Sequence, residues 1–331
     1  MVFKMKKMEP KIVKKVEDDI KRMRDEIAKI VVGQESVVDA LLRGLISDGH
    51  CLVEGVPGIA KTLLIKTLSR ISGCTFTRIQ FTVDLMPSDI VGLTAYDMKK
   101  GFYTVRGPIF SNFVIADEIN RASPKTQSAM LEAMQERQVT IGKETFPLPN
   151  PFFVMASQNP IETLGIYPLP VAQVDRFLFK ICMHYPKPEE ERIILKQNIT
   201  LKRFDDYDLK RVITPSRIIE LQRVAKKIYM SKEIEDYIIK LVNATRNPKK
   251  YGIELGKYIE YGGSPRTSIG LFIGSKTDAL MNGENFVTPQ RVKDVAYDVM
   301  RHRIILDYEG EAEGIRTDDV IKEIISKVPV P

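Results

Sequence analysis

The sequence has few of the side chains that build metal sites or disulfide frameworks, with three cysteines and three histidines in 331 residues. Cys51, Cys74 and Cys182 lie far apart in apolar runs, which predicts reduced cysteines of the core rather than disulfides or metal ligands. The histidines are equally scattered, so the sequence argues against a zinc site.

Long apolar runs are also missing. No stretch approaches the ~18 apolar residues that cross a bilayer. Residues 1–19 carry charge but lack the apolar core of a signal peptide. Hydrophobic residues make up 44% of the chain and charged residues 28%, which is typical of globular proteins. We therefore expect a soluble, cytoplasmic protein with no membrane span.

Positive charge is in excess but is not concentrated. The net charge is +7 and the pI is about 9.1, from 50 basic and 43 acidic residues. Lysine is enriched locally only in the first 25 residues, and no basic motif interleaved with aromatic residues is present. The pattern favours a solvated surface rich in Lys and Glu over a nucleic-acid interface.

Residues 1–29 form the first of three predicted parts. Residues 11–29 have apolar side chains at helical spacing, which predicts an amphipathic helix. This helix either packs on the domain that follows, which we expect, or binds a partner through an exposed stripe. The apolar positions are Ile12, Val13, Val16, Ile20, Met23 and Ile27.

Residues 30–186 alternate short apolar runs with helical segments, which predicts an α/β domain with a mostly parallel sheet. Residues 138–148 are predicted to form an added hairpin that turns at Gly142-Lys143. The expected strands are 50–55, 75–81, 113–118, 151–159 and 177–185, and the expected helices are 61–72 and 123–137. From Pro186 onward the segments are helical and separated by Pro, Gly or Asn. Residues 187–331 are therefore predicted to be an all-α domain.

The stretch "GVPGIAKT" (55–62) nearly matches the phosphate-binding pattern G-x-x-x-x-G-K-[ST], with Ala60 in place of glycine. A strand before the loop and a helix after it supply the context that such a loop needs. Lys61 is expected to reach the β- and γ-phosphates and Thr62 to ligate Mg²⁺. Alanine should be tolerated at position 60 if its dihedral angles are helical rather than at positive φ.

Polar residues end two of the predicted strands. Asp117 and Glu118 follow "NFVIA", and they offer a Mg²⁺ ligand and a base for water, respectively. Asn159 ends "FFVMASQN" and could hold the attacking water and sense the γ-phosphate; the alternative is an ordinary turn asparagine before Pro160.

Two arginines complete the candidate constellation. Arg176 in "VDRF" precedes the last strand, and Arg266 in "GGSPRTS" opens a helix of the second domain. A planar guanidinium stays protonated and binds phosphate oxygens bidentately, which suits transition-state charge. The alternative for either residue is a surface ion pair.

Together these residues resemble the MoxR family of AAA+ ATPases, over most of the chain from Val31 onward. The matching segments are "VVGQ" (31–34), "GVPGIAKT", "RIQFTVDLMPSDIVG" (78–92), "GPIFSNFVIADEINRASPKTQSAMLEAMQERQVT" (107–140), "ASQNPIETLGIYPLP" (156–170), "DRF" (175–177) and "GGSPRTS" (262–268).

The resemblance implies an AAA+ P-loop domain with a five-stranded, mostly parallel sheet, followed by an all-α lid. It also implies an insert between "RIQF" and "GPIF" and a hairpin before the fourth strand. Ala60 resembles a family variant of the loop rather than decay.

The resemblance further assigns roles to individual residues. It implies ATP/ADP and Mg²⁺ as cofactors, with Thr62 and Asp117 at the metal, Glu118 and Lys61 in catalysis, and Asn159 as sensor one. It implies that Arg176 is an arginine finger offered to a neighbouring subunit and that Arg266 is a lid sensor. The implied nucleotide contacts are Val31, Val32, Gly55, Val56, Pro57, Gly58, Ile59, Ala60, Lys61, Thr62, Leu63, Asp117 and Arg266.

The function implied is ATP hydrolysis by a ring, usually a hexamer, coupled to remodelling, maturation or metal-cofactor loading of a client protein. A protein with a von Willebrand factor A domain is the implied adaptor or client. A nucleic-acid motor or clamp-loader-like ATPase and a nucleotide-binding switch with negligible hydrolysis are the alternatives. One departure concerns the subunit interface, because the family usually has glutamate where this chain has Val171.

Overall fold

The chain forms two compact units by its internal contacts. A computed structural model describes residues 9–56, 58–99, 101–160, 165–197 and 204–331. The sheet unit comprises residues 21–177 and 181–219, and the helical unit comprises residues up to 20, 178–180 and 220–331. Residues 187–197 and 204–219 therefore group with the sheet unit, and the predicted three-part division stays a prediction.

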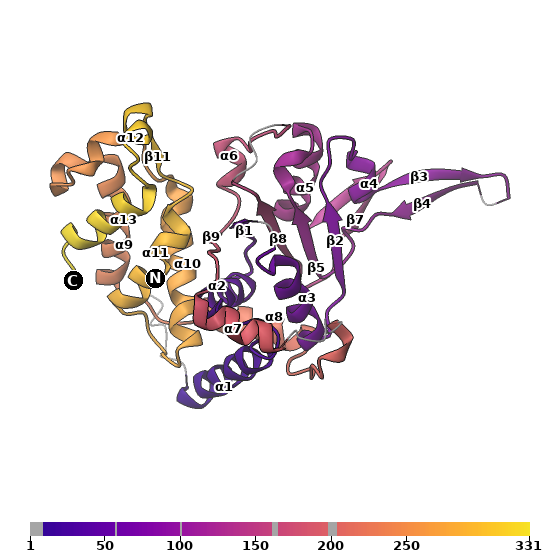
Figure 1. The fold of residues 1–331 in the computed structure, drawn as a ribbon, viewed down its shortest axis with the longest axis horizontal. Helices are drawn as coiled ribbons and strands as arrows, with labels where there is room; N and C mark the ends of the chain where they lie inside the picture. Colours follow the sequence, from indigo (N-terminus) through magenta and orange to yellow (C-terminus); the bar gives the residue numbers. More distant parts are fainter. Residues whose placement is uncertain (1–8, 57, 100, 161–164, 198–203) are drawn as a thin grey trace, which may run out of the picture. The chain divides into compact units, whose positions relative to one another are not determined.

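A five-stranded sheet with strand order β2-β5-β8-β1-β9 is the centre of the sheet unit (Figure 1). Its strands are β1 (Cys51–Glu54), β2 (Phe76–Gln80), β5 (Phe113–Asp117), β8 (Phe153–Gln158) and β9 (Phe179–Cys182). The helices of this part of the chain are α2 (Glu35–Ile46), α3 (Lys61–Ser72), α4 (Pro87–Val91), α5 (Pro124–Glu136), α6 (Val171–Val174), α7 (Pro188–Gln197) and α8 (Pro215–Lys226), with short 3-10 turns η1 (Ile119–Arg121) and η2 (Phe204–Asp206). The α/β fold expected from the sequence is confirmed.

The central strands are apolar along their whole length because both faces of the sheet are covered. All five residues of β5 are buried, as are the first five of the six residues of β8. The pairs β1–β8, β5–β8 and β2–β5 are parallel. In this register Glu54 lies opposite Gln158, and Gln80 lies opposite Asp117. The carboxyl ends of these strands therefore meet at one edge of the sheet.

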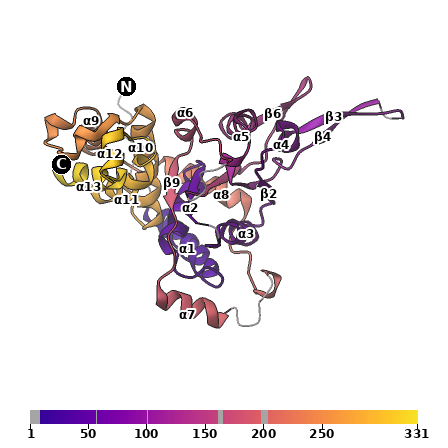
Figure 2. The ribbon, with the colours of Figure 1, turned by 45° about the horizontal axis from the view of Figure 1, so that its top comes forward.

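Two hairpins are added to the sheet unit. The first, β6 (Gln138–Ile141) and β7 (Glu144–Pro147), turns at Gly142-Lys143 as the sequence predicts. The second, β3 (Gly92–Asp97) and β4 (Gly101–Arg106), lies in the predicted insert and extends away from the sheet (Figure 2). Apolar side chains on it are open to solvent, with Tyr96 64%, Phe102 79% and Met98 94% exposed.

The N-terminal helix α1 (Pro10–Ile27) buries the stripe that its sequence predicts. Val13, Val16, Ile20, Met23 and Ile27 are buried, whereas Ile12 at the edge of the stripe is exposed. The C-terminal half of α1 is fixed to α2 by an ion pair of 2.6 Å between Arg24 Nε and Asp39 Oδ1. The stripe is therefore buried rather than exposed, although only residues 21–27 of the helix belong to the sheet unit and residues 10–20 belong to the helical unit.

A buried histidine joins β1 to its neighbours just before the strand begins. The backbone N–H of Val154 donates to His50 Nδ1 at 3.0 Å, so Nε2 carries the proton and donates to Met134 O at 3.0 Å. Burial, and secondarily the positive charge of Arg137, lowers the pKa of His50 to about 3. The imidazole is therefore neutral in the folded protein at every pH at which the protein would be handled.

The low pKa of His50 predicts that the folded protein loses stability in mild acid. Its pKa is about 6.5 when unfolded and about 3 when folded, so the unfolded chain takes up the proton first as pH falls. The contribution of His50 is fully present above pH ~6.5 and falls by about 2 kcal/mol between pH 7.5 and pH 5. Urea unfolding at both pH values should show this difference, and His50→Gln should reduce it by that amount. An identical pH dependence in the variant would contradict the assignment.

The helical unit contains α9 (Lys232–Arg246), α10 (Pro265–Met281), α11 (Pro289–Met300), α12 (Tyr308–Ala312) and α13 (Thr317–Lys327). It also contains the strands β10 (Ile259–Tyr261) and β11 (Ile305–Leu306) and the 3-10 turns η3 (Pro248–Tyr251) and η4 (Leu255–Tyr258). Helices α10 and α11 pack closely because a Cβ at Gly270 would lie only 2.8 Å from Val299 Cγ1. The all-α character expected of this region is confirmed except for the short pair β10–β11.

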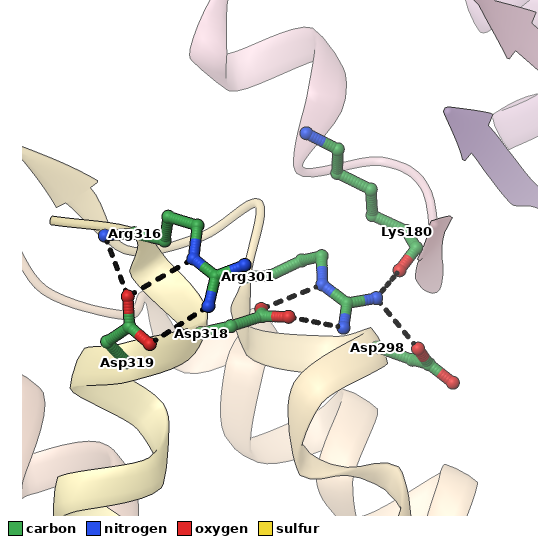
Figure 3. Close-up of polar contacts among 6 residues, drawn as sticks. All are labelled: Lys180, Asp298, Arg301, Arg316, Asp318 and Asp319. Atoms are coloured by element: carbon green, nitrogen blue, oxygen red, sulfur yellow. Dashed lines mark hydrogen bonds and ion pairs between the residues drawn. The ribbon is translucent and has the colours of Figure 1, made fainter. Parts of the chain in front are cut away.

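Arg301 connects three segments of the helical unit (Figure 3). Its Nε and Nη2 donate to the two carboxylate oxygens of Asp318 at 2.9 and 3.0 Å. Its Nη1 donates to Asp298 Oδ1 at 2.9 Å and to the carbonyl oxygen of Lys180 at 2.8 Å. A bidentate pair with an additional backbone contact is a well-oriented arrangement for a guanidinium that is only 12% exposed.

Replacing Arg301 with alanine should lower the free energy of unfolding by about 3 kcal/mol, because two partly buried carboxylates and a carbonyl lose their donor. Arg316→Ala is the matched control, since Arg316 also pairs with an aspartate, Asp319, but is 79% exposed. Its urea midpoint should change little. Equal shifts in the two variants would show that Arg301 acts only as a surface charge.

Candidate functional site

The loop between β1 and α3 forms one wall of the candidate site. Gly55 directly follows β1 in a tightly packed position. A Cβ there would lie 2.6 Å from Ile59 Cδ1 and 3.1 Å from the carbonyl oxygen of Met183. Gly58 has φ of 85°, in the left-handed region that favours glycine. Helix α3 begins at Lys61, so the loop ends at a helix N-terminus as predicted. Pro57 lies outside the described residues.

Ala60 does not have the helical dihedral angles under which alanine is expected to be tolerated. Its φ of 67° and ψ of 22° place it in the left-handed helical region instead. An alanine in this region costs about 1–2 kcal/mol relative to right-handed backbone, because its Cβ approaches the following carbonyl oxygen. The loop therefore has the backbone of the glycine pattern and tolerates a methyl group at some energetic cost.

Restoring the pattern with Ala60→Gly should raise the free energy of unfolding by about 1 kcal/mol, because glycine adopts positive φ without this strain. Ala133→Gly is the matched control, since Ala133 lies inside α5 and glycine there should lower stability by about 1 kcal/mol or more. Urea unfolding measures the free energy of unfolding of both variants and shows which one gains and which one loses stability. A loss of stability at both positions would show that the backbone at position 60 is not strained.

Lys61 lies over the loop. Its Nζ donates to the carbonyl oxygen of Gly55 at 2.7 Å, so the ammonium group is held on the inner side of the loop. The next residue, Thr62, is in the first turn of α3 and is partly exposed. The free N–H groups of a helix N-terminus and a lysine at the same place provide the positive environment in which phosphate groups bind.

A cavity of about 440 Å³ opens beside this loop within the sheet unit. It brings together Val31 and Val32, which are among the implied nucleotide contacts, and four residues of the loop region. Ile30 and Gln34 flank the two valines, and the remaining lining residues come from 185–195, a segment far along the chain that was not predicted to line the site. The cavity is lined by Ile30, Val31, Val32, Gln34, Gly58, Ile59, Ala60, Leu63, Tyr185, Pro186, Glu191, Ile194 and Leu195.

Asp117 is the last residue of β5, and both of its carboxylate oxygens accept hydrogen bonds. Ser157 Oγ donates to its Oδ1 at 2.5 Å. Arg78 donates to its Oδ2 from Nε at 3.0 Å and from Nη2 at 2.6 Å. The side chain of Asp117 is 11% exposed and that of Arg78 is 49% exposed. The carboxylate is therefore held by three hydrogen bonds at the edge of the sheet, whereas its guanidinium partner is half exposed to solvent.

Glu118 adopts a left-handed backbone, with φ of 56° and ψ of 50°. Its backbone N–H donates to Ser157 Oγ at 2.9 Å. Its Oε2 accepts from Gln80 Nε2 at 2.8 Å and lies 3.1 Å from Arg121 Nε. A bulky residue at positive φ is a strained conformation of the kind found at functional sites. In this arrangement the carboxylate that was predicted to act as a base is held by two donors.

Sequence reasoning missed these donors, although a signal was present. Arg78 and Gln80 alternate along β2, so both side chains lie on the same face of the strand. Two polar residues at that spacing indicate polar partners on or just after the neighbouring strand. Arg78 donates to Asp117 and Gln80 donates to Glu118.

The other predicted residues lie in three different places. Asn159 is buried, directly after β8 and next to Gln158, whose carbonyl oxygen accepts from the N–H of Gly55 at 3.3 Å. Arg176 is exposed, two residues beyond α6. Arg266 belongs to the helical unit, where it is exposed in the first turn of α10. The roles of both arginines stay predictions.

The residues at this edge fit a nucleotide with Mg²⁺. The apolar side chains of Val31, Ile59 and Leu63 line the cavity and suit a base, and Lys61 and the start of α3 suit phosphates. Thr62 and Asp117 offer hydroxyl and carboxylate oxygens, the ligand types that Mg²⁺ prefers. Asp117 can accept this role because a carboxylate has more lone pairs than its present partners use.

Comparisons with known protein families agree with this arrangement. A family model described as "ATPase family associated with various cellular activities (AAA)" matches residues 50–179. A second model, "AAA lid domain", matches residues 256–324. The first range contains the loop, Asp117, Glu118, Asn159 and Arg176, and the second contains Arg266.

Several relatives are similar over nearly the whole chain. "Chaperone MoxR1" of Mycobacterium tuberculosis is 46% identical, with 92% of this chain and 81% of that protein covered. "Uncharacterized protein YeaC" of Bacillus subtilis is 41% identical, with 93% of each covered. A protein from Cytophaga hutchinsonii in a crystal structure is 46% identical, covers 97% of both chains and superposes with a TM-score of 0.90.

Proposed function

Because this chain belongs to the MoxR family of AAA+ ATPases, we propose that it binds and hydrolyses ATP with Mg²⁺ at the carboxyl edge of its sheet. One observation carries the proposal. The loop after β1 ends at the N-terminus of α3, and Asp117-Glu118 ends β5, separated from β1 in the sheet only by β8. A site for phosphates and a pair of carboxylates are thus brought to one edge, as phosphoryl transfer to water requires.

Each residue of this edge has a proposed task. Lys61 and the N–H groups of the loop bind the phosphates, while Thr62 and Asp117 hold Mg²⁺, which when bound neutralises phosphate charge. Glu118 accepts a proton from water at a carboxylate oxygen, and Asn159 orients that water. Glu118 can do so only after leaving Gln80 and Arg121, so we propose that the present arrangement is a resting one.

We propose that hydrolysis takes place in a ring, where Arg176 of one subunit completes the site of the next. Its exposure in the sheet unit agrees with this task. Arg266 is proposed to sense the nucleotide from the lid. Val171, where the family usually has glutamate, is 54% exposed at the start of α6 and leaves the surface near Arg176 without that charge.

The proposed role of the ring is to remodel, mature or load metal cofactors into a client protein, with a von Willebrand factor A domain protein as adaptor or client. The hairpin β3–β4 supports a remodelling role. A two-stranded ribbon is barely stable alone, and this one exposes Tyr96, Met98 and Phe102 to solvent. Such side chains are suited to apolar segments of another protein.

No helix in the described part of the chain is long and apolar enough to cross a membrane. We propose a cytoplasmic location, as expected for an ATP-driven remodelling protein.

Phosphate release from ATP by the purified chain tests this function, with and without Mg²⁺. We expect turnover that requires Mg²⁺ and disappears when EDTA removes the metal. Tight ATP binding without release of phosphate, with a ring present, would favour the nucleotide-binding switch. Stimulation of turnover by DNA, together with an affinity for DNA that falls steeply with salt, would favour a nucleic-acid motor.

A further inference from the structure

A second cavity lies at the other end of α3 from the phosphate-binding loop. Its volume is about 590 Å³, and it is formed entirely within the sheet unit. We call it the basic groove and define it by Lys66, Arg70 and Arg211, the rings of Phe76 and Phe204, and Cys74. Nothing in the proposed ATPase reaction uses these residues.

The three cations of the basic groove have no carboxylate partner among the residues that the structure describes. Lys66 Nζ lies 4.2 Å from the centre of the Phe204 ring. Arg211 Nε donates weakly to the carbonyl oxygen of Ile213 at 3.4 Å. Asp205 is the one acidic residue in the lining, and it forms no ion pair with them. The basic groove therefore has a surplus of positive charge.

Cys74 does not compensate this charge. Burial raises the pKa of its thiol, and the nearby charge of Arg211 does not reverse that shift. The thiol is neutral near pH 7, so it leaves Arg211 uncompensated. The guanidinium of Arg211 also lies directly against Gly73, where a Cβ would be 2.6 Å from Nε. The glycine thus leaves room for a cation in the lining of the groove.

The spacing of the charges points to the class of ligand. Lys66 and Arg70 are four residues apart on α3, which places neighbouring side chains about 6 Å apart on one helix face. Alternate side chains of an extended peptide are about 6.6 Å apart. Carboxylates at every second position can therefore meet successive cations. A single phosphate is less well matched, because it needs donors that converge on one point and favours a helix N-terminus, whereas this groove lies at the C-terminal end of α3.

We propose that the basic groove binds an extended acidic segment of a partner polypeptide in which carboxylates and one aromatic or aliphatic side chain occupy alternate positions, so that they share one face of the segment. The carboxylates pair with Lys66, Arg70 and Arg211, and the apolar side chain packs against Phe76 and Phe204. Binding at this groove is independent of ATP hydrolysis, so it can be measured whether or not the chain is active.

The test uses the full chain and a fluorescein-labelled peptide of sequence EGEGFGE, followed by fluorescence anisotropy at several salt concentrations. We expect binding that weakens as salt rises, and the neutral peptide QGQGFGQ should bind at least about tenfold more weakly. Lys66→Glu/Arg70→Glu should weaken EGEGFGE binding about tenfold or more and should gain affinity for KGKGFGK. Lys66→Gln/Arg70→Gln, a milder change, should give an intermediate loss.

Lys249→Glu/Lys250→Glu is the matched control, since it makes the same change in net charge at exposed positions of the helical unit. It should leave EGEGFGE binding within about twofold. Equal losses in the groove and control variants would overturn the proposal, because binding would then follow net charge alone. Tighter binding of inorganic triphosphate at Lys66 and Arg70, with no binding of the peptide, would overturn it in favour of a phosphate ligand.

Discussion

Replacing Glu118 with glutamine is expected to lower ATP turnover by about 10²–10⁴-fold while ATP binding persists. Glutamine has nearly the same shape as glutamate but cannot accept the proton of the attacking water. It can still occupy the space beside Gln80 and Arg121, so the loop and cavity should keep their structure. Phosphate release and equilibrium binding of a fluorescent ATP analogue measure the two properties separately.

Glu132→Gln controls for the loss of one negative charge, because Glu132 is an exposed residue of α5 away from the edge of the sheet. Its turnover should equal that of the unmodified chain. An unchanged rate in the Glu118 variant would remove this residue as the base. Loss of ATP binding together with turnover would instead show that the carboxylate maintains the structure of the site.

Replacing Arg176 with alanine is expected to lower turnover by about 10³-fold, because an arginine finger stabilises charge on the phosphoryl group in the transition state. Arg176 is exposed in the sheet unit, so its removal should not disturb folding. The fall should appear in kcat with little change in ring formation or ATP affinity. Arg223→Ala, at an exposed position of α8, is the control.

Mixing the two inactive variants tests whether Arg176 acts on a neighbouring subunit. A subunit with Arg176→Ala keeps Glu118, and a subunit with Glu118→Gln keeps Arg176, so some interfaces in a mixed ring have both groups. With equal amounts and independent sites, turnover should recover to about a quarter of that of the unmodified ring. A mixture that stays inactive although its subunits exchange would show that Arg176 serves its own site.

Much of the fold could be predicted because local pattern and tertiary structure agree. The apolar run 113–118 became the buried strand β5, and Ser123-Pro124 capped and began α5 as the sequence indicated, with Ser123 Oγ accepting from the N–H of Thr126. Asp117 and Glu118 were expected at the end of a strand because they directly follow an apolar run. The local apolar pattern and the capping residues were sufficient for these features.

The parts that could not be predicted depend on contacts between distant residues. Arg78 and Gln80 are 39 and 38 residues away from the carboxylates that they hold. The cavity wall from Tyr185 to Leu195 lies more than 100 residues from the loop it faces. The dihedral angles of Ala60 follow from the path of the loop between β1 and α3, which residue type alone does not specify. Such features are set by tertiary structure rather than by local preference.

The most direct test of the central claim is the ATPase rate per chain as a function of protein concentration, with Mg²⁺ and saturating ATP, alongside sizing of the same samples. A shared active site predicts a rate per chain that rises with concentration in parallel with ring formation and then reaches a plateau. A monomer that hydrolyses ATP at a constant rate per chain would contradict the account, because no neighbouring Arg176 would then be required.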